Sequence, residues 1–380
     1  MRIVHVLSGR CSPGSANGVV KFIYDLSRVQ AREHEVFVFS LTTERPIPID
    51  GVHVRAFAPS RNALAVPREM KVALLKAIPD IAHFHSVFIP QHVFLAAWLR
   101  RRGIRYAASP HGGLSPLGLR RKRFRKWLFK HLLERDFWNR AAFVHAVSDL
   151  EVDHIRRYGI VRPIVVAPHG ITVDELPDPS ALNPNVLFDT FPQTKAKRVF
   201  LFLGRLDPFH KGLDLLLDAC ARARDSLEHA CVVIVGPDWR GKRRSLEERA
   251  KHLGLTQMVV FAGPRYVVEK FEFLAACDVF VHPSRWEAGI PFSVLEALAF
   301  QKPCLITNAI GFRDFFERIP VGRRVQQSAE AIAQALRYFA RLPEAELLGM
   351  GVRARNAVLS EFSWVRTKAK LEQAYARAIQ

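Results

Sequence analysis

Nothing in this sequence is apolar for long enough to cross a lipid bilayer. A spanning helix needs about 20 apolar residues, whereas the longest apolar run, around Val199 to Leu203, has the length of a strand. The opening residues MRIVHVLSGR lack the apolar core and cleavage pattern of a signal peptide, so we expect a buried first strand there. The cysteines are few and lack metal-site spacing, which predicts reduced core residues in a cytoplasmic protein. They are Cys11, Cys220, Cys231, Cys277 and Cys304.

Acidic residues are also scarce. The chain has 36 Asp and Glu against 56 Lys and Arg, a net charge of +20, and residues 1–200 contain 16 of the acidic and 30 of the basic residues. The positive electrostatic field of such a chain attracts anions, for example a membrane surface, an acidic glycan or nucleic acid. The net charge can also serve solubility alone. The sequence has no G-x-G-x-x-G motif and no RNA-binding signature. These absences argue against a dinucleotide cofactor and against nucleic acid as a partner.

Short apolar runs alternate with longer amphipathic runs along the chain, and this alternation predicts parallel sheets covered by helices. We expect strands at residues 3–7, 35–41, 52–57, 81–85, 105–109, 143–147, 164–167, 198–203, 231–235, 258–261, 279–281 and 304–307. We expect helices at residues 19–31, 90–101, 120–139, 149–158, 212–222, 246–252, 268–276, 292–300 and 329–341.

The length of 380 residues is too great for one ordinary core and suits two. Residues 173–197 contain four prolines and no clear period, as a linker does. We therefore expect an α/β fold of two Rossmann-like, doubly wound domains, at residues 1–172 and 198–362, facing each other across a cleft. Residues 363–380 are predicted to form an amphipathic helix that packs back across the domains.

Two basic and two acidic residues follow expected strands of the second half. Arg205 and Lys211 lie in FLFLGRLDPFHKG, and Glu287 and Glu296 lie in HPSRWEAGIPFSVLEALAF. The carboxyl ends of neighbouring parallel strands form a ligand crevice. Guanidinium and ammonium groups suit a diphosphate, and carboxylates accept hydrogen bonds from sugar and ribose hydroxyls. The four residues predict a nucleotide-sugar site.

These stretches occur in order with ANGVVKFIYDLSR, SPHGGLSPLGL, AVSDLEVDHIRR, APHGI and IVGP. The ordered set resembles the retaining GT-B glycosyltransferases of glycosyltransferase family 4, over nearly the whole chain. The resemblance implies transfer of a sugar from a UDP-, GDP- or similar nucleotide sugar, with retained configuration and with no metal or cofactor. It also implies a glycan or lipid-linked acceptor, in the synthesis of bacterial surface polysaccharide or lipopolysaccharide.

The resemblance assigns roles to individual residues, with His111, Arg205, Lys211 and Glu287 as the catalytic candidates. Arg205 and Lys211 would grip the donor diphosphate, Glu287 the sugar hydroxyls, and His111 would lie near the donor sugar and the acceptor hydroxyl. Glu296 would bind the ribose, and the helix start that precedes it would direct its amides at the donor. The remaining donor contacts would come from Gly18, Tyr266, Gly289, Ile290, Pro291, Phe292 and Ser293, with Tyr266 near the base.

The spacing of the two glutamates departs from the family pattern. Eight residues separate Glu287 from Glu296, where the family has seven, and Ala288 replaces the usual glycine. Glu287 therefore reaches the sugar by a different loop path, or does not reach it.

Three further histidines, His83, His85 and His145, also end expected strands. Together they suggest a metal site, but whole βα units separate them in the sequence, and the resembled enzymes typically need no metal. We therefore expect none.

The segment LGLRRKRFRKWLFKHLLERDFWNR is strongly basic. Its patch residues are Arg120, Arg121, Lys122, Arg123, Arg125, Lys126, Trp127 and Lys130. On a helix, Phe124, Leu128 and Leu132 form one apolar stripe among the cations. Such a helix suits an anionic bilayer or an acidic acceptor, unless the stripe is simply part of the core. The corresponding localisation is cytoplasmic, with peripheral attachment to the inner face of the plasma membrane.

The function predicted from the sequence is therefore glycosyl transfer. Two alternatives stay open: a nucleotide-sugar epimerase on the same fold, and a non-catalytic GT-B relic that binds glycan or nucleic acid. An epimerase would need an acid/base pair at a sugar carbon, and no such pair is evident. A relic would bind neither UDP nor GDP.

Overall fold

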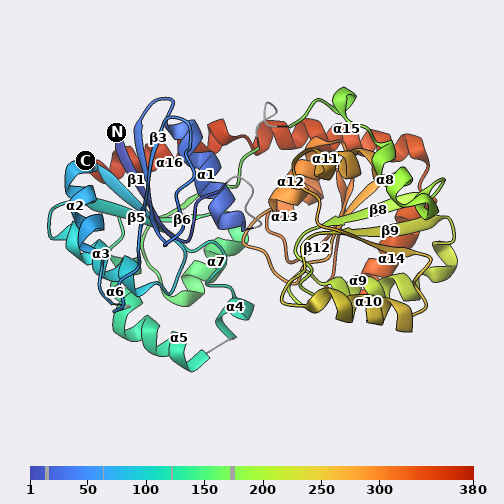
Figure 1. The fold of residues 1–380 in the computed structure, drawn as a ribbon, viewed down its shortest axis with the longest axis horizontal. Coiled ribbons are helices and arrows are strands. Elements are labelled where there is room, and N and C mark those ends of the chain that lie inside the picture. Colours follow the sequence, from blue (N-terminus) through green and yellow to red (C-terminus); the bar gives the residue numbers. More distant parts are fainter. Residues whose placement is uncertain (13–16, 63, 121–122, 172–175) are drawn as a thin grey trace. The chain divides into compact units, whose positions relative to one another are not determined.

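The computed structural model describes residues 1–12, 17–62, 64–120, 123–171 and 176–380. They form two compact units: unit 1 contains Met1–Gly170 and Trp364–Gln380, and unit 2 contains Ile171–Ser363. Each unit is a parallel sheet with helices on its faces (Figure 1). The α/β fold class predicted from the alternating pattern is confirmed.

The strands of unit 1 are β1 (Arg2–Ser8), β2 (Glu35–Leu41), β3 (Val52–Phe57), β4 (Ile81–His85), β5 (Arg105–Ser109), β6 (Val144–Ala146) and β7 (Ile164–Val166). Its helices are α1 (Gly18–Gln30), α2 (Arg68–Ala77), α3 (Pro90–Arg100), α4 (Pro116–Arg120), α5 (Arg123–Phe129), η1 (Lys130–Glu134), α6 (Arg135–Asn139), α7 (Asp149–Tyr158) and α16 (Trp364–Ile379). The strands lie in the order β3-β2-β1-β4-β5-β6-β7.

The strands of unit 2 are β8 (Arg198–Leu203), β9 (Ala230–Val235), β10 (Val259–Gly263), β11 (Val279–His282), β12 (Cys304–Thr307) and β13 (Gly322–Val325). Its helices are η3 (Pro179–Ala181), α8 (Asn185–Thr190), η4 (Pro192–Thr194), α9 (Leu213–Arg222), η5 (Arg224–Ser226), α10 (Lys242–His252), α11 (Val267–Ala276), α12 (Phe292–Ala299), α13 (Arg313–Arg318), α14 (Ala329–Arg341) and α15 (Glu344–Glu361). The strands lie in the order β10-β9-β8-β11-β12-β13.

Both sheets reverse their strand order at one point. The neighbours there are β1 and β4 in unit 1, and β8 and β11 in unit 2. Ligands of open α/β sheets bind at such a reversal, beyond the carboxyl ends of the strands. Arg205 and Lys211 follow β8, and Glu287 follows β11. The topology therefore places three of the predicted donor residues at the reversal of unit 2.

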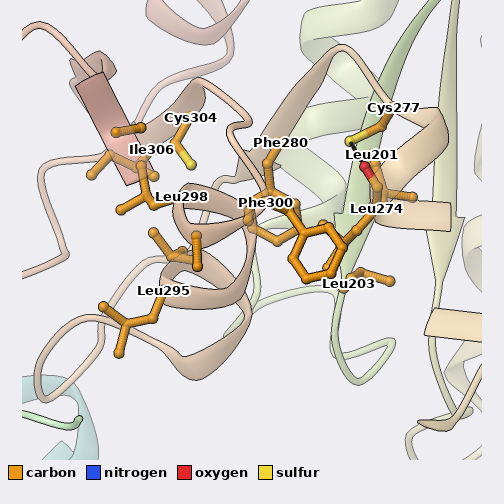
Figure 2. Close-up of a cluster of buried hydrophobic side chains, with 14 of the residues drawn as sticks. Leu201, Leu203, Leu274, Cys277, Phe280, Leu295, Leu298, Phe300, Cys304 and Ile306 are labelled. Atoms are coloured by element: carbon orange, nitrogen blue, oxygen red, sulfur yellow. Dashed lines mark hydrogen bonds between the residues drawn. The ribbon is translucent and has the colours of Figure 1, made fainter. Parts of the chain in front are cut away.

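The strands at the reversal are anchored by apolar packing on both faces. Leu201 and Leu203 of β8 pack with Phe280 of β11 in the cluster that Figure 2 shows, whereas Phe200 and Phe202 belong to the cluster on the opposite face. Full burial of one such side chain stabilises the fold by about 1.5–3 kcal/mol. The loops after these strands therefore start from a rigid base.

The cysteines lie in the cores of the two units. All five are buried and unpaired, which confirms the prediction that they are core residues. Burial raises the pKa of the Cys220 and Cys277 thiols to about 12, so both stay protonated and unreactive at neutral pH.

Most of the segment predicted to be a linker is built into unit 2. Residues 179–194 include η3, α8 and η4, and Leu187 of α8 is fully buried in the core. Pro179 and Pro192 lie in the first turns of η3 and η4, where the missing N–H breaks no helical hydrogen bond. These prolines interrupted the sequence pattern because they begin short helices. Residues 172–175, at the start of that segment, lie outside the described part of the chain.

The C-terminal residues form the expected amphipathic helix, α16. It lies beside α1 in unit 1 (Figure 1), with Trp364 and Tyr375 fully buried. The Tyr375 hydroxyl lies 2.6 Å from Nδ1 of His83, which belongs to β4 of the same unit.

The long helix expected over 120–139 is divided into α5, η1 and α6. The π-helical turn η1 shifts the register, so that Glu134 is buried and accepts hydrogen bonds from the Phe88 N–H and the Tyr158 hydroxyl. Apolar residues of α5 and of the turn itself stay in solvent: Phe124 of α5 is 74% exposed and Leu132 of η1 is 69% exposed. The explanation of this apolar stripe as core is therefore wrong.

Candidate active site

A glycine holds the loop after β8 against the loop after β11. Gly212 has a φ of 65°, and a Cβ at this position would lie 2.0 Å from the carbonyl oxygen of Pro283. Only glycine permits so close an approach of two backbone segments in this conformation. Lys211 directly precedes the glycine, so its side chain starts beside the residues that follow β11.

Lys211 and Glu287 form a largely buried ion pair. The distance from Lys211 Nζ to Glu287 Oε1 is 2.6 Å, and the side chains are 12% and 14% exposed. The same carboxylate oxygen accepts hydrogen bonds from His282 Nε2 at 3.0 Å and from Ser284 Oγ at 2.8 Å. No described residue bonds to Glu287 Oε2. That oxygen is left to accept from a ligand hydroxyl.

The surroundings keep Glu287 ionised. Burial by itself raises the pKa of Glu287, but the Lys211 ammonium and the hydrogen bond from His282 outweigh it and hold that pKa well below 4.5. Burial lowers the pKa of His282, and it lowers the pKa of His210 to about 4. At neutral pH the site therefore combines a buried carboxylate, an ammonium group and two neutral imidazoles.

Arg205 comes from the same loop as Lys211 but has a different partner. Its guanidinium carbon lies 4.3 Å from the ring centroid of Trp239, which follows β9. A cation–π contact of this kind fixes the orientation of the guanidinium. The N–H groups lie in the guanidinium plane, where phosphate oxygens bind.

Glu296 lies on α12 and is 8% exposed. Its Oε1 pairs with Lys270 Nζ of α11 at 2.8 Å. The helix begins after Gly289 and Ile290, with Pro291 at the N-cap and Phe292 and Ser293 in the first turn, and Pro291 gives no side-chain cap. Such a helix start suits an anion. Tyr266, at the N-cap of α11, is 56% exposed.

His111 follows β5 in unit 1. Its Nε2 lies 2.9 Å from His85 Nδ1, and its ring packs edge-on against Phe22 of α1 at 5.1 Å. Its Nδ1 is shielded from solvent and has no hydrogen-bond partner among the described residues. Burial, reinforced by His145 and His169, holds the pKa of His111 well below 6.5. At neutral pH its imidazole is neutral and suited to hydrogen bonding.

A buried carboxyl group supports the turn that carries His111. Glu151 of α7 accepts hydrogen bonds from the backbone N–H of Gly112 and, at 2.8 Å, from that of Val147. Burial raises the pKa of Glu151 to about 7, against the lowering effect of these two bonds. Ser148 caps the same helix, with its Oγ accepting from the Glu151 N–H at 3.1 Å.

Gly18 is the first residue of α1. The Asn17 side chain caps this helix by accepting from the Val19 N–H at 3.1 Å. A Cβ at Gly18 would meet no atom within 4 Å. The space beside the predicted donor glycine is therefore open in the described part of unit 1.

The argument that whole βα units keep the strand-end histidines apart is wrong. The β1–β4 register places His5 directly beside His83, and one ring nitrogen from each of His5, His83 and His85 lies within 4.8 Å of the other two. Three such nitrogens could hold a metal ion. However, all six already take part in hydrogen bonds, with each other or with Gln30, Ser109, Tyr375 and His111. The geometry favours a hydrogen-bonded network over a vacant metal site.

The basic segment presents fewer free cations than its sequence suggests. Lys126 Nζ donates to the Gly118 carbonyl oxygen at 2.6 Å, and Lys130 Nζ lies 4.3 Å from the Tyr158 ring centroid. Arg120, Arg123, Arg125 and Trp127 are exposed. Arg121 and Lys122 lie outside the described residues.

Sequence reasoning brought Lys211 and Glu287 to one site but missed the groups that hold them. His282 and Ser284 both bond to Glu287, and His210 stacks on Trp286 with a centroid distance of 4.1 Å and an interplanar angle of 6°. One signal was available, because His282 ends β11 just as His85 ends β4. Nothing in the sequence pointed to Gln30 or Tyr375.

Two family models match successive parts of the chain. The model described as Glycosyltransferase Family 4 matches residues 16–175, and the model described as Glycosyl transferases group 1 matches residues 197–341. The first match falls mainly in unit 1 and the second in unit 2.

Two relatives are similar in sequence. The D-inositol 3-phosphate glycosyltransferase of Geodermatophilus obscurus is 32% identical over 249 residues, 60% of this chain and 50% of that protein. The phosphatidyl-myo-inositol mannosyltransferase of Mycobacterium tuberculosis is 25% identical over 339 residues, 87% of this chain and 81% of that protein. The chain thus spans about half the length of the first relative and most of the second.

The fold is also that of solved structures, among them WaaG, a glycosyltransferase involved in lipopolysaccharide biosynthesis, which matches with a TM-score of 0.72 at 17% identity over 99% of each chain. The structure of Anabaena HepE in complex with UDP-glucose matches with a TM-score of 0.77 at 18% identity, covering 99% of each chain. This likeness and the two parallel-sheet units show that the chain has the GT-B fold. The two family models together support a glycosyltransferase of the family 4 and group 1 type.

Proposed function

We propose that this protein transfers a sugar from a nucleoside-diphosphate sugar, with retention of configuration, to a phosphate-bearing or lipid-linked acceptor in surface-glycan synthesis. The observation that carries the proposal is the buried Lys211–Glu287 pair at the strand reversal of unit 2. It combines a cation for a diphosphate with a carboxylate whose second oxygen is left to accept from a hydroxyl. The complex of HepE with UDP-glucose supports a donor of this class.

In the proposed reaction, Lys211 and Arg205 bind the donor diphosphate and stabilise the negative charge that develops as it leaves. The acceptor hydroxyl attacks the anomeric carbon from the face that the diphosphate leaves. The C–O bond to the diphosphate breaks, and a departing phosphate oxygen takes the acceptor proton. This step uses no side-chain nucleophile and no metal ion. Glu287 accepts from hydroxyls of the donor sugar, and His111 and the Gly18 backbone act from unit 1.

The nucleoside would be held by residues at the starts of α11 and α12. Glu296 accepts from the ribose hydroxyls, and the backbone from Gly289 to Ser293 faces the diphosphate at the start of α12. Tyr266 is exposed at the start of α11, and in this proposal its ring stacks on the base.

Calorimetry with UDP and GDP tests the donor site. The unmodified protein is expected to bind one of them, and Glu296→Ala to weaken that binding by roughly 10- to 100-fold, because hydrogen bonds to a charged group are worth about 1.5–3 kcal/mol. Glu248→Ala, on the exposed side of α10, should leave the affinity unchanged. Failure of the unmodified protein to bind either nucleotide would defeat the proposal and favour a non-catalytic relic.

The acceptor side of the proposal rests on charge and on exposed apolar residues. Arg123 and Arg125 flank the exposed Phe124 and precede the exposed Trp127 on α5. An amphipathic helix with aromatic side chains and surrounding arginines binds the interface of an anionic bilayer. The two relatives described above are named for phosphoinositol acceptors, one of them a lipid. No helix among the described residues is both long and apolar enough to span a membrane, so attachment would be peripheral.

The double charge reversal Arg123→Glu/Arg125→Glu is expected to weaken binding to anionic vesicles. Each cation near the surface contributes about 1 kcal/mol, so loss of two lowers the partition coefficient by about 30-fold or more. The matched control is Arg244→Glu/Lys251→Glu on α10, which changes the net charge equally on exposed residues of unit 2. Co-sedimentation with liposomes measures both. Equal binding by the two double variants would contradict the membrane surface.

A further inference from the structure

Hydrogen bonds join buried polar residues of unit 1 into a chain that begins at a backbone carbonyl. His145 Nε2 lies 2.7 Å from the Ala167 carbonyl oxygen, and His145 Nδ1 lies 2.7 Å from Ser109 Oγ. Ser109 Oγ also lies 2.6 Å from His83 Nε2, and His83 Nδ1 lies 2.6 Å from the Tyr375 hydroxyl. The first branch therefore runs from β6 across β5 and β4 to α16.

A second branch runs from Gln30 of α1 to His111. Gln30 Oε1 lies 2.8 Å from His5 Nε2, His5 Nδ1 lies 3.0 Å from His85 Nε2, and His85 Nδ1 lies 2.9 Å from His111 Nε2. Burial raises the pKa of the Tyr375 hydroxyl, and the nearby Gln30 side chain opposes the rise. The Gln30 amide nitrogen nevertheless has no hydrogen-bond partner among the described residues, so the second branch ends at the Gln30 amide oxygen.

The direction of every bond in the first branch follows from its carbonyl end. A carbonyl oxygen only accepts, so His145 carries its proton on Nε2. Burial lowers the pKa of His145 to about 4 and that of His83 well below 6.5, so both rings are neutral. His145 Nδ1 then accepts from the Ser109 hydroxyl, Ser109 Oγ accepts from His83 Nε2–H, and His83 Nδ1 accepts from the Tyr375 hydroxyl.

The second branch ends in the same way, at an oxygen that only accepts. Gln30 Oε1 is an amide oxygen 2.8 Å from His5 Nε2, so His5 carries its proton on Nε2 and donates it to Gln30. His5 Nδ1 accepts from His85, and His85 Nδ1 accepts from His111 Nε2–H. His111 is left neutral, with a lone pair on Nδ1.

We propose that the second branch sets the tautomer of His111, so that its unprotonated Nδ1 accepts a hydrogen bond from a sugar hydroxyl. Gln30, His5 and His85 are then positioning residues that act through His111. The unpartnered Nδ1 of His111 is the observation that points to a ligand. The inference deepens the proposed function and rests on it, because it specifies the chemistry that unit 1 offers to the sugars. In this form His111 accepts a hydroxyl proton in a hydrogen bond and does not donate one to the leaving group.

The test is a two-bond ¹⁵N–¹H correlation spectrum of the full-length protein labelled with ¹⁵N-histidine, which reports which ring nitrogen carries the proton. The variant His111→Asn assigns the His111 signals. In the unmodified protein the expected form of His111 has the proton on Nε2. Gln30→Leu removes the acceptor for His5 Nε2–H, and His85→Phe removes the acceptor for His111 Nε2–H. In both variants His111 should lose its single tautomer and become a mixture of the two.

A control variant separates the network from ordinary repacking. Leu26→Met changes a fully buried apolar residue on α1 with little change of volume, and it should leave the tautomer of His111 unchanged. If Gln30→Leu does not fold, His85→Phe, which keeps an aromatic ring at the buried position, still supplies the test. A proton on Nδ1 in the unmodified protein, or an unchanged tautomer in the folded variants, would overturn the inference. The spectrum needs no nucleotide, so this result is independent of whether UDP or GDP binds.

Discussion

Lys211→Met is expected to lower turnover by about 100- to 1,000-fold, the usual effect of removing one group that stabilises developing negative charge. The Lys211 ammonium would face the diphosphate as the bond to the sugar breaks, whereas a methionine side chain has no charge to offer. The measurement is the steady-state release of nucleoside diphosphate from a donor that the protein binds. Near-native turnover by this variant would contradict the diphosphate assignment.

Lost stability could imitate this loss of turnover, because Lys211 and Glu287 are buried together. Breaking a buried pair by removing one partner costs about 3–5 kcal/mol. The double variant Lys211→Met/Glu287→Gln removes both charges and should recover much of the unfolding free energy while turnover stays low. Urea unfolding of both variants, followed by tryptophan fluorescence, separates the two effects.

Arg205→Ala supplies an independent comparison. Arg205 contacts the half-buried ring of Trp239 and forms no ion pair with any described residue. We expect a similar fall in turnover with little change in unfolding free energy. Agreement between the Arg205 and Lys211 variants would locate the diphosphate between the two cations.

The second large effect is a steep loss of stability in acid, caused by the buried histidines of unit 1. Burial lowers the pKa of His5 and of His145 to about 4, and that of His83 and His85 well below 6.5. Between pH 6.5 and 4 the unfolded chain binds protons at these positions and the folded protein does not. The free energy of unfolding therefore falls as the pH falls through this window. With about 1.4 kcal/mol for each pKa unit, the expected loss is several kcal/mol.

Buried carboxyl groups also change how the free energy of unfolding depends on pH, and they do so in opposite directions. The pKa of Glu151 is raised to about 7 by burial, so its contribution to stability is present in acid and is lost as the pH rises from about 4.5 to 7. The lowered pKa of Glu287 means that unit 2 loses the stability of its ion pair below pH 4.5. The histidines outnumber Glu151 between pH 6.5 and 4, so the net slope in that window follows them.

Urea unfolding at a series of pH values measures this slope, and His92→Phe offers a matched variant. His92 of α3 is 2% exposed, packs against Phe84, and has no hydrogen-bond partner on either ring nitrogen among the described residues. Burial lowers its pKa to about 3. Replacing it with a phenyl ring should make the acid loss shallower by about one proton. A flat stability profile between pH 6.5 and 4 would rule out neutral buried histidines.

The sequence predicted strands well where apolar residues are continuous or alternate. The bounds of β2, β3, β4, β5, β8 and β12 are those expected, and α14 begins and ends at the expected residues. The missed elements lack such patterns. Strand β13 contains Arg323 and Arg324, and only half-buried or exposed side chains, because it lies at the edge of the sheet. Helix α2 covers one side of its sheet with four buried residues among lysines and an arginine.

Some residues of the candidate site could also be predicted from the sequence, and others could not. Sequence position relative to strand ends was sufficient to select Arg205, Lys211 and Glu287, because the topology of a parallel sheet brings such ends together. It did not select His282 or Ser284, since a hydrogen bond to Glu287 depends on rotamers and loop paths.

The sequence by itself determined the two α/β units, the buried cysteines and the strand-end residues of the proposed donor site, because the local periodicity of apolar residues indicates which side chains are buried. Tertiary structure alone decided the histidine network, in which His83 and Tyr375 are 292 positions apart in sequence. It also decided that the apolar residues of α5 stay exposed beyond the π-helical turn. Contacts of this kind depend on which strands become neighbours and on where a helix changes register, and no local pattern encodes either.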